Sequence, residues 1–135
     1  MVVRAVITLL CGVGLYASLF MLAKSRKAER GELLEPSVVE LPRARLYGGV
    51  QNSLLGSLYY PAFGLAIWWV RSPIGMVVLL VVVLLAAITS VVLGYSLLFV
   101  TRRECSYCWT GHIVNLTLLV LYCWLFVSNI LSRGI

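Results

Sequence analysis

Residues 105–132 read CSYCWTGHIVNLTLLVLYCWLFVSNILS and contain no lysine, arginine, aspartate or glutamate. A helix needs roughly 20 predominantly apolar residues to cross the hydrocarbon core of a bilayer. Three other segments of the chain are equally free of formal charge, and they are 5–23, 46–70 and 72–101. Because backbone groups in lipid must be hydrogen-bonded within their own segment, we expect each of the four to form a membrane-spanning helix.

The composition also indicates an integral membrane protein. Of the 135 residues, 61% are hydrophobic and 12% are charged, whereas soluble domains have about 25% charged residues. A net charge of +6 often indicates nucleic-acid binding. Here the cations lie in the links between apolar runs, as is typical of membrane proteins. We therefore expect lipid around the chain and no nucleic-acid partner.

The predicted fold is all-α, a bundle of four transmembrane helices in a single domain over residues 1–135. The helices are expected at about 5–23, 50–70, 74–100 and 105–131. A cleaved signal peptide is the alternative for the first run. That run is longer than a usual signal core and no small-residue cleavage site precedes the charged cluster, so we expect a retained helix.

The long link 24–46 is charged and contains Pro36 and Pro42, which argue against one continuous helix. Four spans would place it on the same membrane face as the short link 102–104. Its apolar residues could pack on the bundle as an interfacial cap, and they are Leu33, Leu34, Val38, Val39 and Leu41.

Polar residues follow one stripe of the fourth predicted helix. At 100° per residue, Cys105, Cys108, His112 and Asn115 fall within a sector about 80° wide. Polar groups inside a membrane are costly and suggest function. A helix start favours thiolate over thiol, as does nearby positive charge, and thiolate is the reactive form. The Cys-x-x-C therefore favours a dithiol redox centre.

Other interpretations of the Cys-x-x-C remain open. A metal site has only three candidate ligands, Cys105, Cys108 and His112, whereas structural zinc normally takes four. A haem attachment motif requires histidine where Trp109 stands. A purely structural disulfide within one helical turn would stabilise the fold very little. Cys11 and Cys123 lie inside the first and fourth predicted spans, where we expect them to be small buried hydrophobes.

The chain resembles the vitamin K epoxide reductase family, including its bacterial and archaeal disulfide-forming homologues. The resemblance covers most of the chain: four predicted helices, a long first link and a Cys-x-x-C opening the fourth helix. The segment NSLLGSLYY, residues 52–60, also looks like the family's Asn-Ser-x-x-Gly-x-x-(aromatic) signature.

The resemblance implies a helix bundle around a quinone of the menaquinone or ubiquinone type. Cys108 matches the cysteine that reacts with the quinone, and Cys105 matches the cysteine that exchanges disulfides with a partner. Asn52 matches an asparagine that hydrogen-bonds the quinone head, and His112 replaces a tyrosine with the same role in vertebrate members. Three further residues are expected to line the quinone pocket, and they are Leu55, Tyr59 and Tyr60.

The first link departs from the family pattern. The family usually carries two cysteines there, at positions that fall at about Leu34 and Pro42, but residues 24–45 contain none. We expect no fused thioredoxin-like domain after the fourth helix. We therefore expect a separate thioredoxin-like protein to exchange its disulfide with Cys105.

Counting cations predicts the orientation. With four spans, one side holds three cationic residues (Arg4, Arg71, Arg133) and the other holds the remaining eight of the eleven. The positive-inside rule then places the Cys-x-x-C on the cytoplasmic side, whereas most of the family has its site outside the cytoplasm.

The sequence thus predicts a multi-pass membrane enzyme that passes electrons from a partner dithiol to a quinone. The alternative is a non-catalytic membrane subunit whose Cys-x-x-C is structural or binds metal.

Overall fold

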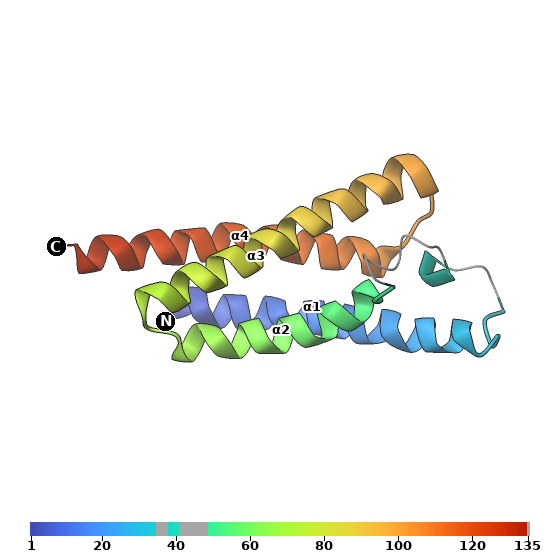
Figure 1. Ribbon diagram of the computed structural model, residues 1–135, viewed down its shortest axis with the longest axis horizontal. Coiled ribbons are helices and arrows are strands. Elements are labelled where there is room, and N and C mark those ends of the chain that lie inside the picture. The colour runs from blue at the N-terminus through green and yellow to red at the C-terminus, as the bar shows by residue number, and fades with distance from the viewer. Residues whose placement is uncertain (35–37, 41–48, 135) are drawn as a thin grey trace.

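Four long helices make up most of the molecule (Figure 1), a computed structural model that describes residues 1–34, 38–40 and 49–134. They are α1 (Val2–Glu29), α2 (Asn52–Trp69), α3 (Pro73–Tyr95) and α4 (Ser106–Arg133). Short helix η1 (Val38–Glu40) follows α1, and α3 continues as a π-helical segment, η3 (Ser96–Thr101). The described residues form no strand, so the all-α prediction is confirmed.

The helices alternate in direction, so that the start of α1 and the end of α4 lie at one end of the bundle (Figure 1). Among the described residues, three segments are long and apolar enough to cross a membrane, and they are Val2–Glu29, Pro73–Thr101 and Ser106–Ser132. The remaining long helix, α2, has 18 residues, with a polar start and two tryptophans at its end. These three segments correspond to three of the four membrane-spanning helices that the sequence predicts.

The first helix is longer than the sequence predicts. We expected it to end near residue 23, but α1 continues through KSRKAE to Glu29. Lysine, arginine, alanine and glutamate are strong helix formers, so the helix persists after its apolar run has ended. In Figure 1 the last turns of α1 extend beyond the start of α4.

The helices pack in three neighbouring pairs: α1 with α2, α1 with α4, and α3 with α4. The contacts surround buried side chains such as Ile7, Phe63 and Leu118. Figure 1 shows α3 diverging from α2 towards the end where α4 begins. In the described part of the chain, α2 and α3 are not a closely packed pair.

Small residues and hydrogen bonds hold these pairs together, as is common in membrane bundles. A Cβ added at Gly14 of α1 would overlap the ring of Tyr60, so α2 approaches α1 closely there. Trp68 donates from Nε1 to Oγ1 of Thr8 over 3.0 Å. At the other end of α1, Nε2 of Gln51 donates to Oε1 of Glu29 over 2.6 Å. Both ends of α2 are therefore fixed to α1.

Part of the long link packs on the bundle. Helix η1 packs against α1, and Val39 lines a cavity inside the bundle. Leu34, in contrast, is fully exposed and does not pack on the bundle. Pro36, Leu41 and Pro42 lie outside the described residues.

Candidate redox site

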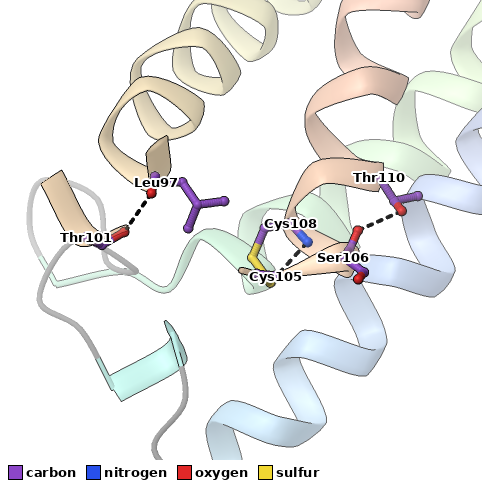
Figure 2. Close-up of a disulfide and its surroundings, with 6 residues drawn as sticks. All are labelled: Leu97, Thr101, Cys105, Ser106, Cys108 and Thr110. Carbon is purple, nitrogen blue, oxygen red and sulfur yellow. Dashed lines mark hydrogen bonds between the residues drawn. A yellow bond between two sulfur atoms is a disulfide. The ribbon is translucent and has the colours of Figure 1, made fainter. Parts of the chain in front are cut away.

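Cys105 and Cys108 form a disulfide at the start of α4 (Figure 2). Cys105 is the N-cap residue and has extended backbone angles, whereas Cys108 lies in the first turn. Their Cα atoms are 5.2 Å apart. The backbone N–H of Cys108 donates to Sγ of Cys105 over 3.2 Å. The sulfur of Cys105 thus takes the place that a serine or aspartate oxygen usually has at a helix start.

A sharp change of direction brings the chain to this disulfide. The π-helical η3 ends at Thr101, whose hydroxyl donates to the carbonyl of Leu97 over 3.2 Å. Arg102 then takes left-handed backbone angles, φ 48° and ψ 36°. It is the one residue other than glycine with a positive φ among those described. π-Helical turns often occur at functional sites, and here η3 lies directly before the Cys-x-x-C.

A cavity of about 380 Å³ lies beside the disulfide, between α1, α2, α3, η3 and α4. Its wall is mostly apolar, and its volume falls within the range of small-molecule sites. Six of the predicted site residues line it, and they are Asn52, Leu55, Tyr59, Tyr60, Cys108 and His112. Cys105 is not part of the lining.

The two cysteines therefore differ in what they face. Cys108 lines the cavity, and the side chain of Leu97 points towards it from η3 (Figure 2). Leu97 is 6% exposed and lines the same cavity. Cys105 follows directly after the exposed residues Arg103 and Glu104. One disulfide thus connects an interior cavity with the surface link before α4.

Three of the four residues in the polar stripe predicted on α4 face this cavity. Cys108, His112 and Asn115 all contribute to its lining. His112 is 9% exposed, and its ring lies edge-on to Trp109 with centroids 6.0 Å apart. Across the interface with α3, a Cβ added at Gly94 would be 3.7 Å from Cδ2 of His112. An alanine at position 94 would therefore make an ordinary van der Waals contact with the imidazole ring.

A hydrogen-bond chain crosses the bundle next to His112. The hydroxyl of Tyr60 donates to Oδ1 of Asn115 over 3.0 Å, and Nδ2 of Asn115 donates to Oγ of Ser90 over 2.6 Å. The chain links α2, α4 and α3. The sequence placed Asn115 on the polar stripe but predicted no function for it. Ser90 was not among the predicted site residues. The pair Thr89–Ser90 in an otherwise apolar run was the available signal.

Aromatic contacts position the walls of the site. Tyr59 lies against Phe63 with ring centroids 5.5 Å apart, and its buried hydroxyl has no hydrogen-bond partner in the described part of the chain. Tyr107, between the two cysteines, stacks on Phe20 of α1 at 3.9 Å. It lines the cavity and ties the Cys-x-x-C to α1. Tyr107 was not among the predicted site residues, because nothing in the sequence pattern indicates that it stacks on Phe20.

The other two cysteines lie apart from the disulfide. Cys11 is buried against Gly64, as expected for a small hydrophobe. Cys123 is exposed, so the prediction of burial is wrong for it: it lies on an outer face of α4. Within residues 1–34, 38–40 and 49–134, no three histidine, cysteine or acidic side chains are grouped as metal ligands would be.

Apolar helices of membrane-spanning length, with a Cys-x-x-C disulfide at a helix start, are typical of membrane-embedded thiol–disulfide redox proteins. The sequence matches the vitamin K epoxide reductase family over residues 5–123. This match covers most of the chain, and the protein belongs to that family. It is therefore a multi-pass membrane oxidoreductase. No individually curated protein matches the chain.

Proposed function

We propose that this protein oxidises a dithiol of a thioredoxin-like protein through Cys105 and Cys108 and passes the electrons to a quinone. The observation that carries the proposal is the position of the disulfide, because Cys108 lines the cavity and Cys105 does not. In the net reaction, the partner dithiol loses two electrons and two protons, and the quinone becomes a quinol.

The exchange half of the reaction follows from the two sulfur positions. A partner thiolate attacks Sγ of Cys105, the Cys105–Cys108 bond breaks, and Cys108 leaves as a thiolate. A second partner thiolate then attacks the mixed disulfide and releases Cys105. The N–H of Cys108 stabilises negative charge on Sγ of Cys105, because it already donates to that sulfur. The partner leaves with a disulfide, and the Cys-x-x-C is left reduced.

The cavity fits a quinone by its chemistry. Its apolar wall suits a flat ring, and a few polar side chains are available to fix the ring's orientation. Leu55, Tyr59 and Tyr60 would form the wall, while Asn52 and His112 would donate hydrogen bonds to quinone oxygen. When bound, the quinone supplies the two-electron acceptor for the reduced Cys-x-x-C. Both the menaquinone and the ubiquinone types fit this description.

The partner meets Cys105 directly in this proposal. The chain has four cysteines, at positions 11, 105, 108 and 123, so its first link carries no cysteine pair to relay electrons. Cys105 is partly exposed beside Arg103 and Glu104. A thioredoxin-like protein would therefore place its own reactive thiol against the start of α4.

The proposal also makes α2 a fourth span. Helix α1 ends at the opposite end of the bundle from the start of α3, so α2 returns the chain along the bundle (Figure 1). Its 18 residues are about 27 Å long, close to the roughly 30 Å of a hydrocarbon core. Four spans, together with the cation count, would place the Cys-x-x-C on the cytoplasmic side.

One assay tests the function. Purified protein is mixed with a short-chain quinone and a reduced thioredoxin-like protein, and quinol formation is followed by absorbance. The Cys108→Ala variant should lose turnover. Cys123→Ala is the matched control and should keep it, because Cys123 is exposed on the same helix, about 22 Å along the axis from Cys108. Absence of turnover in the unaltered protein would favour a non-catalytic subunit, and full turnover in Cys108→Ala would exclude the mechanism.

A further inference from the structure

The side-chain amide of Asn115 is held from two sides. Its Oδ1 accepts the hydroxyl proton of Tyr60, and its Nδ2 donates to Ser90 over 2.6 Å. Tyr60 and Ser90 are 2% and 3% exposed, so both contacts lie in the interior of the bundle. Because the two partners come from different helices, the amide plane of Asn115 is fixed relative to the cavity.

One N–H of this amide remains available. An asparagine amide has two donor hydrogens, and Ser90 takes one of them. The second hydrogen has no partner in the part of the chain that the structure describes. Asn115 is itself partly exposed and lines the cavity. A donor held in a fixed orientation at the wall of an apolar cavity favours a ligand that brings an acceptor.

The position of Asn115 along α4 defines which end of the cavity it serves. Cys108, His112 and Asn115 lie on one stripe of this helix, and all three line the cavity. His112 is about 6 Å and Asn115 about 10 Å from Cys108 along the helix axis. Asn52, at the start of α2, lines the same cavity near the end of the bundle where α4 begins. Asn115 therefore lies deeper in the bundle than Cys108 and His112 do.

We propose that Asn115 is a ligand-binding residue, whose second amide N–H donates a hydrogen bond to the deeper of the two oxygens of the bound quinone. The inference rests on the proposed function and extends it to the second carbonyl group. Tyr60 then has two roles, since its ring forms part of the wall and its hydroxyl orients Asn115. The site would recognise ligands with oxygens at both edges of the ring.

The test measures quinone affinity directly. Binding of a short-chain ubiquinone and a short-chain menaquinone is followed by quenching of tryptophan fluorescence, for which Trp109 beside His112 is well placed. Asn115→Leu should raise the dissociation constant about tenfold, which corresponds to about 1.4 kcal/mol. The matched control is Asn129→Leu, because Asn129 lies on the same helix outside the cavity and donates to its own helix at Leu125. Its dissociation constant should equal that of the unaltered protein.

Ser90→Ala separates ligand binding from a purely structural role. This variant removes the Asn115–Ser90 bond but keeps the amide donor, so it should weaken quinone binding less than Asn115→Leu does. Equal losses in the two variants would overturn the inference, as would an unchanged dissociation constant in Asn115→Leu. If neither quinone binds to the unaltered protein, the proposed function itself fails.

A spectroscopic measurement on the unaltered protein avoids dependence on the folding of the variants. Infrared difference spectra are recorded with quinone carrying ¹³C at each carbonyl carbon in turn. Both carbonyl bands should lie at lower frequency than in an apolar solvent, because each oxygen accepts a hydrogen bond. A single shifted band would overturn the assignment of Asn115.

Discussion

Replacing Gly14 by alanine should disturb the site through Tyr60. A Cβ at position 14 would overlap the Tyr60 ring, with Cε1 and Cζ as its nearest atoms. The ring is buried, and its hydroxyl is bonded to Asn115 on the far side. To accommodate the new methyl group, the ring must move towards the cavity, or α1 and α2 must separate. Either change strains the contact between Tyr60 and Asn115.

The magnitude follows from a comparison with Gly12. Overpacking a well-packed interior costs about 1–3 kcal/mol, whereas glycine to alanine within a helix gains about 1 kcal/mol. Gly12 is exposed on the same helix, with nothing within 4 Å of an added Cβ. The propensity gain is common to both variants. The free energy of unfolding of Gly14→Ala should therefore lie about 1–3 kcal/mol below that of Gly12→Ala.

Denaturant unfolding of the purified variants in detergent micelles measures this difference. Quinone affinity is measured on the same samples. Gly14→Ala should bind quinone more weakly than Gly12→Ala, because Tyr60 and Asn115 are both displaced. Equal stability of the two variants would contradict a close approach of α1 and α2 at Gly14.

Three further predictions concern the link, the imidazole and the orientation. Arg102→Gly should raise the free energy of unfolding by about 0.5–1 kcal/mol in a denaturant titration, because glycine adopts a positive φ without steric cost. Arg103→Gly is the control, and it should lower the free energy of unfolding in the same titration. His112→Phe should reduce the rate of quinone reduction more than the rate of disulfide exchange in stopped-flow measurements, and equal losses would argue against a quinone contact. A reporter fused after Ile135 should be exposed outside the cell, and a cytoplasmic reporter would contradict the orientation inferred from the cations.

The helices were predictable because charge is costly in lipid. Each apolar run ends at a charged residue, and these residues mark where the chain leaves the hydrocarbon core. They do not mark where a helix ends, which is why α1 continues to Glu29. The start of α4 was also predictable, because the Cys-x-x-C follows a cluster of charges. The π-helical turns of η3 were not, since nothing in an apolar run distinguishes them from α-helix.

The site was predictable along one helix and not across helices. A 100° rotation per residue was enough to place Cys108, His112 and Asn115 on one stripe. Contacts between helices depend on how each helix is rotated and tilted, which a single sequence does not specify. The stacking of Tyr107 on Phe20 is one contact of this kind, and the hydrogen bond from Asn115 to Ser90 is another. Both became visible only with the packed bundle.

The weak contact between α2 and α3 has a consequence for kinetics. Residues of both helices line the cavity, but the helices themselves are not closely packed where the structure describes them. A ligand that enters between them comes from the bilayer, so its concentration per volume of lipid, rather than per volume of buffer, determines how often the cavity is filled. The apparent KM for a quinone would then increase as detergent or lipid is added at constant total quinone, while kcat would stay the same.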